Sequence, residues 1–324
     1  MKKLLAIVLT LALTLTLFGC SGGSSSEDSS APSGKGEKLK IGIIQIMEHP
    51  SLDEIRTAFL NEMAALGYDE NKVEYDYQNA QGEGANVTSI CQKFVGDEVD
   101  MIVAIATPSA QGAAAATSEI PIIFSAVTDP VTAELVESLE VPGGNVTGTS
   151  DAIPVERIFE LADELTPGNQ TYGFIYNLSE PNSVSVIGDA KAFLDAKNVS
   201  YVEACISNVG ELTAAAEGLV GRVDAIFCPI DNTVASGMVT LAEIATNAGI
   251  PVYVSADSMV ADGGLATVGV NYTNLGKQTA QMAADVLEGA DPGQMPVQVL
   301  SEYSVAVNQE TAAALNIDVS KYAA

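Results

Sequence analysis

The chain has 324 residues, of which 47% are hydrophobic and 17% are charged. Its 42 acidic side chains outnumber the 14 basic ones, which gives a formal net charge of -28. This composition excludes nucleic-acid binding through a basic surface, because phosphate recognition depends on clustered Lys and Arg. The length favours two domains of roughly 150 residues, each large enough for its own hydrophobic core.

The N-terminus has the composition of a targeting segment followed by a tether. Two lysines precede the apolar run 4–18, which is too short to span a bilayer comfortably. The run ends in Leu-Phe-Gly-Cys (17–20), which resembles the lipobox of bacterial lipoproteins, where cleavage precedes an acylated cysteine. We expect a signal peptide over 1–19, lipidation of Cys20 and a flexible Gly/Ser-rich tether over 20–38. The alternative is an ordinary secretory signal with a coincidental cysteine.

Short apolar runs alternate with amphipathic stretches from residue 39 onward, which is typical of a βα series. Expected strands of the first series lie at 40–45, 73–78, 99–105, 120–127 and 145–150, and expected helices at 51–67, 84–96, 108–118 and 130–139. Ser51 and Glu54 have the spacing of a capping box at the start of the first helix.

A second series repeats the first. Its expected strands lie at 171–177, 199–206, 223–230, 250–256 and 265–271, followed by a helix at 273–290 and a strand at 297–305. Gly42 corresponds to Gly173 and Pro50 to Pro181, both at a spacing of 131 positions. These shared landmarks indicate two similar lobes.

The predicted fold is α/β, with two similar doubly wound parallel-sheet lobes joined by several crossover segments. One lobe is expected to hold 39–150 with about 273–296, and the other 151–272 with about 297–324. The chain is expected to cross between lobes near 149–155, 269–274 and 293–298. Ligands of such sheets bind beyond the carboxyl ends of the strands, so the site is expected in the cleft between the lobes.

Four segments carry a resemblance to a known family. They are FVGDEVDMIVAIATPSAQ (94–111), IPIIFSAVTDPV (120–131), PGGNVTGTS (142–150) and DAIFCPIDNTV (224–234). They resemble the tryptophan/tyrosine-type substrate-binding proteins of ABC transporters, which have the type I periplasmic-binding fold. The resemblance implies capture of a small extracellular solute, often an amino acid, for partner permease and ATPase subunits of an importer.

Polar residues that follow the expected strands form the candidate binding site. They are Gln45, His49, Asn79, Thr107, Ser109, Ser125, Thr128, Asp129, Tyr176, Asn182, Ser183, Asp231, Asn232 and Asp257. The set contains no Lys or Arg, so a ligand carboxylate would rest on helix N-terminal N–H groups at 107–109 or 182–183. A ligand ammonium would meet Asp129, Asp231 or Asp257. The set therefore suits a zwitterionic L-amino acid, and the resemblance favours an aromatic or large apolar one.

Each of these aspartates also has a structural interpretation, because Asp before a helix is a common N-cap. His49 is open between a ligand contact and a partner of the loop backbone. The three cysteines after the tether, Cys91, Cys205 and Cys228, show no CxxC spacing, and Cys205 and Cys228 are expected to be buried free thiols.

Enzymatic function is not expected. The only histidine, His49, has no GxSxG nucleophile motif beside it, and neither a metal-ligand cluster nor a nucleotide-binding glycine motif is present. We therefore expect a monomeric, membrane-tethered solute-binding protein without metal or cofactor. A tethered ligand sensor for a signalling receptor is the alternative, which genes for a permease and an ATPase nearby would exclude.

Overall fold

The computed structural model describes residues 38–322. The predicted signal peptide, Cys20 and nearly all of the predicted tether lie outside this range. No helix within the described range is both long and apolar enough to cross a bilayer.

The first sheet, here called the N-terminal sheet, has the order β11-β5-β4-β3-β1-β2 with every neighbouring pair parallel. Its strands are β1 (Leu39–Gln45), β2 (Val73–Asn79), β3 (Met101–Ile105), β4 (Ile122–Ser125), β5 (Val146–Ser150) and β11 (Gln298–Val299). β1 and β3 alternate little between polar and apolar residues because helices cover both faces of the sheet.

The second sheet, the C-terminal sheet, has the order β12-β10-β9-β8-β6-β7. Its strands are β6 (Thr171–Asn177), β7 (Ser200–Ile206), β8 (Ala225–Cys228), β9 (Val252–Val254), β10 (Ala266–Gly269) and β12 (Ser304–Val307). Only β12 among these described strands is antiparallel to its neighbour. The predicted α/β fold with two doubly wound lobes is confirmed.

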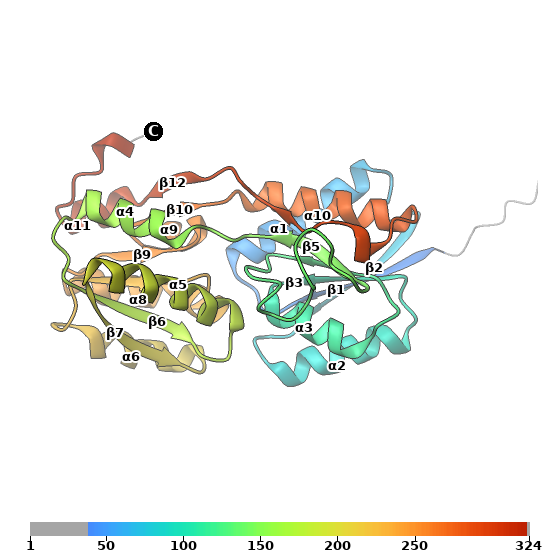
Figure 1. Ribbon diagram of the computed structural model, residues 1–324, viewed down its shortest axis with the longest axis horizontal. Coiled ribbons are helices and arrows are strands. Elements are labelled where there is room, and N and C mark those ends of the chain that lie inside the picture. The colour runs from blue at the N-terminus through green and yellow to red at the C-terminus, as the bar shows by residue number, and fades with distance from the viewer. Residues whose placement is uncertain (1–37, 323–324) are drawn as a thin grey trace, which may run out of the picture. The chain divides into compact units, whose positions relative to one another are not determined.

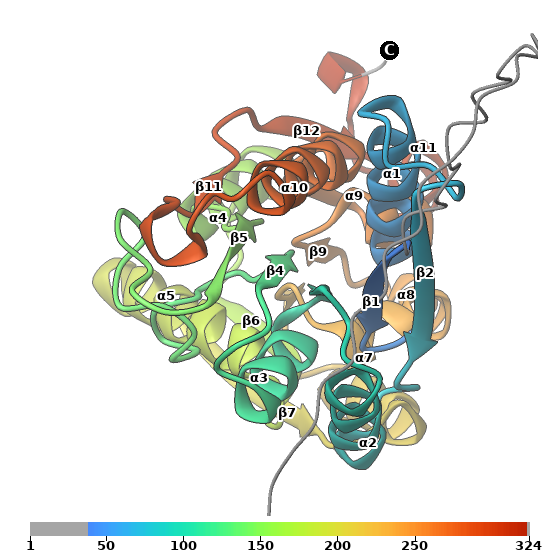
Figure 2. The same cartoon turned by 90° about the vertical axis from the view of Figure 1, so that its right-hand side faces the viewer.

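Helices cover both faces of each sheet. Those of the first lobe are α1 (Pro50–Ala65), α2 (Gly84–Gly96), α3 (Thr107–Ala116) and α10 (Tyr272–Leu287). Those of the second are α4 (Val155–Leu165), α5 (Pro181–Lys197), α6 (Leu212–Leu219), α7 (Asn232–Ser236), α8 (Met238–Asn247), α9 (Asp257–Ala261) and α11 (Gln309–Ala314). α10 packs along α1 on one face of the N-terminal sheet, and α2 and α3 lie on the other (Figures 1 and 2).

The internal repeat is visible in matching positions of the two lobes. A Cβ on Gly42 in β1 would lie 2.7 Å from the Phe94 ring of α2, and a Cβ on Gly173 in β6 would lie 2.6 Å from Leu219 of α6. In both lobes the glycine therefore allows a helix side chain to approach the first strand closely.

Two expected elements are wrong. The helix predicted over 130–139 is a set of turns, since Glu134 adopts φ 58° and ends the first turn after Pro130. The strand predicted over 297–305 is two strands in different sheets, because β11 pairs with β5 and β12 pairs with β10.

Two local expectations also fail. His49, not Ser51, is the N-cap residue of α1, because Pro50 already has helical geometry; Ser51 therefore forms no capping box. Cys228 is a buried free thiol as expected, but Cys205 is exposed because β7 is an edge strand; Cys91 is also buried and free.

The chain crosses between the sheets at three places within the described range: 151–154, 270–271 and 300–303. The third crossing follows β11, not the expected stretch 293–298. The first two begin where β5 and β10 end, so residues at these crossings lie beside the strand ends that surround the cavity described next.

Candidate functional site

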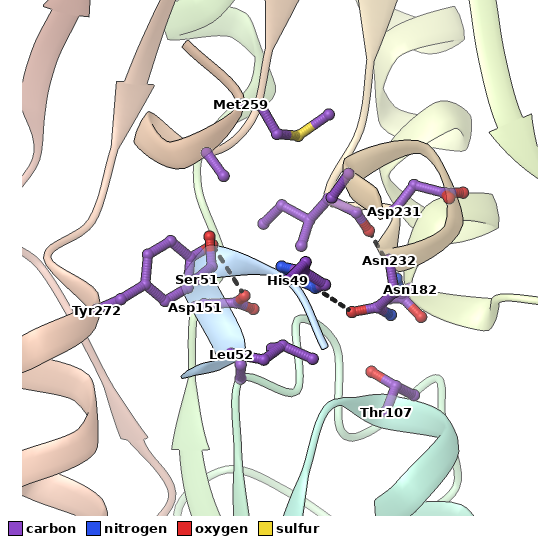
Figure 3. A pocket seen from close by; sticks show the side chains of 14 residues that line it. His49, Ser51, Leu52, Thr107, Asp151, Asn182, Asp231, Asn232, Met259 and Tyr272 are labelled. Carbon is purple, nitrogen blue, oxygen red and sulfur yellow. Dashed lines mark hydrogen bonds between the residues drawn. The ribbon is translucent and has the colours of Figure 1, made fainter. Parts of the chain in front are cut away.

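A cavity between the two lobes encloses an empty volume of about 380 Å³, solvent at its mouth included. Its lining combines residues from both lobes and from the crossings (Figure 3): His49, Ser51, Leu52, Thr107, Ala126, Asp151, Asn182, Ile230, Asp231, Asn232, Ala235, Ala256, Met259 and Tyr272.

Strand order explains why these residues meet. In each lobe the order reverses next to the first strand, between β1 and β3 and between β6 and β8. Loops that leave neighbouring strands at such a reversal diverge to opposite faces and leave a crevice at the carboxyl edge of the sheet. His49 and Thr107 come from the first crevice, and Asn182 and Asp231 from the second.

A chain of hydrogen bonds links His49 to the second lobe. Glu180 is buried, and its Oε2 accepts the side-chain N–H of Asn232 at 2.6 Å and the backbone N–H of Asn232 at 2.9 Å. This fixes the Asn232 amide so that its Oδ1 faces His49 Nε2, at 3.2 Å. Burial lowers the pKa of His49, so the ring is neutral. His49 therefore donates through Nε2, and Nδ1 remains an acceptor.

Asp231 is buried and caps α7. Its Oδ1 accepts the Val234 N–H at 2.8 Å, while its Oδ2 accepts the Asn177 N–H at 2.6 Å and the Ser183 hydroxyl at 2.7 Å. Desolvation, followed by the neighbouring Glu180 charge, raises the pKa of Asp231 to about 7. Both carboxylate oxygens thus have partners within the protein.

Asp151 is the second buried carboxylate of the cavity, and it has fewer hydrogen-bond partners than Asp231. It follows β5 directly, is 1% exposed, and accepts the Thr128 hydroxyl through Oδ1 at 2.9 Å. The nearest partner of Oδ2 is the Tyr272 hydroxyl, which lies at the long distance of 3.5 Å. Burial raises the pKa of Asp151 to about 6. No Lys or Arg occurs among the described residues that line the cavity, so this carboxylate has no cationic partner there.

Three further polar atoms at the cavity are buried and have no hydrogen-bond partner within residues 38–322. They are His49 Nδ1, Thr107 Oγ1 and Asn182 Oδ1. Buried polar atoms in folded proteins are normally satisfied, so these three are candidates for hydrogen bonds to a molecule in the cavity, water or ligand.

Helix starts and strained backbone also surround the cavity. α1 contributes Ser51 and Leu52 from its first turn, and α3 contributes Thr107. The N–H groups at a helix start attract anions. Ala106 and Ala126, at the ends of β3 and β4, have φ of 75° and 55°. Such left-handed non-glycine residues are uncommon and concentrate at functional sites.

Of the residues predicted from the sequence, five line the cavity: His49, Thr107, Asn182, Asp231 and Asn232. Others hold the surrounding loops: Gln45 accepts from Arg56, Ser125 bonds to Thr279, and Thr128 and Ser183 bond to Asp151 and Asp231. The remainder lie outside the lining: Asn79, Ser109, Asp129, Tyr176 and Asp257.

Several lining residues were missed, above all Asp151 and Tyr272. Asp151 comes immediately after an expected strand, as the predicted site residues do, so that same criterion would have found it. The apolar lining residues, including Leu52, Ile230 and Met259, gave no comparable signal because their hydrophobicity matches that of the core.

A family model described as "ABC transporter substrate binding protein" matches residues 40–323. The chain belongs to this family. Substrate-binding proteins of ABC transporters are non-enzymatic binding proteins that work outside the cytoplasm, and this one has their type I periplasmic-binding fold.

Named relatives agree with this assignment. A tyrosine-binding protein of Clostridioides difficile (strain R20291) is 40% identical over 321 residues, which covers 98% of this chain and 93% of the relative. A Streptococcus pneumoniae ABC domain, solved in complex with L-Trp, is 38% identical with a TM-score of 0.85 and covers 87% of this chain and 96% of that one.

A third relative is less similar to this chain in its three-dimensional structure. The ligand-free, open structure of a Clostridium difficile substrate-binding protein is 40% identical but has a TM-score of 0.67, over 86% of this chain and 95% of that one. The substrate-binding protein described here therefore matches the L-Trp complex more closely in its three-dimensional structure than it matches the open structure.

Proposed function

We propose that this substrate-binding protein captures an L-amino acid with an aromatic side chain and delivers it to an ABC importer. The observation that carries the proposal is Asp151, a buried carboxylate in the cavity without a cation near it. A ligand ammonium would supply the missing charge and a donor for Oδ2.

The rest of the cavity suits the remainder of an amino acid. Ser51 and Leu52 lie beside Asp151 in Figure 3, and the N–H groups of this first turn of α1 provide a place for the ligand carboxylate. Apolar side chains, among them Leu52, Ile230 and Met259, provide contacts for a large side chain. The relatives named for tyrosine and solved with L-Trp support an aromatic one.

We further propose that the mature protein is held at the membrane by acyl chains on Cys20 and acts as a monomer. The tether after Cys20 is rich in Gly and Ser, a composition that leaves the binding domain free to move. Permease and ATPase subunits are the expected partners.

The ligand class is tested by thermal shift and calorimetry with amino acids, sugars, nucleosides and polyamines. A ligand that binds only the folded state stabilises it by about 2.7 kcal/mol at a hundredfold excess over Kd. We expect a rise in melting temperature with aromatic L-amino acids alone. A response confined to sugars or nucleosides would contradict the proposed ligand class.

A further inference from the structure

Asn182 places an amide oxygen in the cavity, and its orientation is determined by its neighbours. Its Nδ2 donates to the Ile230 carbonyl at 2.6 Å and lies 3.3 Å from both Glu180 Oε2 and Ser183 Oγ. Three acceptors around one amide group identify it as the NH₂. The other terminal atom of the amide is therefore Oδ1. A flipped amide would place Oδ1 against these three acceptors, where it could form no hydrogen bond with them.

Asn182 Oδ1 is a buried acceptor that forms no hydrogen bond within the described residues. Asn182 is 4% exposed, it lines the cavity, and its Oδ1 has no hydrogen-bond partner among residues 38–322. A buried acceptor that loses its water without gaining a donor is destabilising. Since Oδ1 is an uncharged acceptor, the group that would satisfy it is a hydrogen-bond donor on the bound molecule.

The position of Asn182 indicates which part of the ligand it meets. In Figure 3, Asn182 and Asp151 lie on opposite sides of the cavity, with Leu52 and His49 between them. A ligand whose ammonium contacts Asp151 therefore presents a different part of itself to Asn182. The side chain is the only part of an amino acid that extends away from its ammonium and carboxylate.

We infer that Asn182 Oδ1 accepts a hydrogen bond from a donor on the ligand side chain, a phenol O–H or an indole N–H. This inference rests on the proposed function and adds a selection rule to it: the site distinguishes tyrosine and tryptophan from phenylalanine. Phenylalanine fits the same apolar surface but leaves Oδ1 unsatisfied. The cost of one unsatisfied buried acceptor corresponds to about 5- to 150-fold in affinity.

The first experiment uses the wild-type protein and four ligands: L-tyrosine, L-tryptophan, L-phenylalanine and O-methyl-L-tyrosine. Calorimetry should show L-tyrosine or L-tryptophan binding at least about fivefold more tightly than L-phenylalanine, with the methyl ether also weak because it has no donor. Equal affinities for tyrosine, tryptophan and phenylalanine would overturn the inference while leaving the proposed function intact. Binding of none of the four would contradict the proposed function itself.

The second experiment assigns the selection to Asn182. Asn182→Leu, which keeps the branching at Cγ and the number of side-chain heavy atoms without an acceptor, should reduce the preference over L-phenylalanine to within about threefold of unity. Asn79→Leu is the matched control, because Asn79 lies outside the cavity lining and its Oδ1 already accepts the backbone N–H of Gln81 at 2.7 Å. It should keep the wild-type preference.

The alternative role for Asn182, contact with the ligand ammonium, predicts a different pattern. Asn182→Leu would then weaken all four ligands by the same factor, and an unchanged preference of this kind would overturn the inference. If Asn182→Leu fails to fold, the affinities of the wild-type protein for tyrosine, tryptophan and phenylalanine decide whether the inference holds.

Discussion

His49 Nε2 lies 3.2 Å from Asn232 Oδ1, which joins residues 183 positions apart on different lobes. The contact bridges the two lobes, so it stabilises the arrangement in which they enclose the cavity, here called the closed state. Because Glu180 orients Asn232, the first lobe meets a rigid acceptor and not a freely rotating amide.

Loss of this contact should appear mainly in ligand dissociation. We expect His49→Ala to raise the dissociation rate constant about tenfold, since Asn232 Oδ1 is left unpaired in the closed state, while the association rate constant changes less. Stopped-flow fluorescence or surface plasmon resonance measures both. His49→Gln, whose amide is able to donate, should recover part of the loss. A slower association with unchanged dissociation would contradict the role in closure.

Asp151→Asn should greatly reduce affinity. Truncating one member of a buried charge pair costs about 2–5 kcal/mol, or roughly 30-fold to several-thousand-fold in Kd. Stability of the ligand-free variant should not fall, because the substitution removes a charge that burial disfavours. Asp257→Asn, at an exposed carboxylate outside the lining, is the control. Calorimetry that shows equal affinities for wild type and Asp151→Asn would exclude Asp151 as the ammonium partner.

Affinity should depend on pH through the same residue. Burial raises the pKa of Asp151 to about 6, and the ligand ammonium pairs only with its ionised form. The apparent Kd should therefore rise as pH falls through about 6, by roughly tenfold at one unit below the pKa. Calorimetry between pH 5 and 8 measures it, and the dependence should disappear in Asp151→Asn.

As pH falls, the free energy of unfolding of the ligand-free protein should rise, whereas its affinity for ligand should fall. When folding raises the pKa of a carboxyl group, the folded state binds more protons than the unfolded state at intermediate pH. The group therefore lowers the free energy of unfolding at pH values above its folded-state pKa. This destabilisation is gone at pH values below its unfolded-state pKa. Asp151 at about 6 and Asp231 at about 7 both act in this sense. Their contribution to unfolding free energy should thus increase as pH falls from about 7 to 4. Denaturant titrations comparing wild type with Asp151→Asn isolate the part due to Asp151.

Asp231→Asn separates capping from ligand contact. Asn is able to accept the Val234 N–H, but its NH₂ would then face the Asn177 N–H that Asp231 Oδ2 accepts. We expect about 1–3 kcal/mol lower stability from this opposed pair of donors, with ligand affinity changed less than about tenfold. Chemical denaturation and calorimetry test the two effects separately. An unchanged stability together with a collapse in affinity would instead make Asp231 the ammonium partner.

Membrane attachment should depend on Cys20. We expect Cys20→Ser to leave an exported protein in soluble fractions, because stable anchoring needs acyl chains on that thiol. Fractionation after a salt wash, with Cys205→Ser as the control, measures the distribution. Recovery of the Cys20→Ser protein in the membrane pellet would contradict lipid anchoring.

The strand positions and the repeat could be predicted because apolar runs and landmarks such as Gly42 and Gly173 occur at the same places in both halves. The strand at 297–305 was wrong because hydrophobicity does not show which sheet a strand joins. Of the residues chosen because they follow strands, His49, Thr107 and Asn182 line the cavity. Their hydrogen bonds could not be predicted, since whether Asp231 or Asp151 has free lone pairs depends on distant partners such as Ser183 and Thr128.

The three crossings at 151–154, 270–271 and 300–303 restrict how the two lobes are able to move. A single connecting strand would let one lobe swivel in any direction, whereas several connections resist twisting because the outer ones would have to stretch. Bending about the axis that the crossings define is the motion that these connections oppose least. The crossings would thus set the direction in which the lobes separate, and a bound ligand would change only the fraction of time that they spend apart.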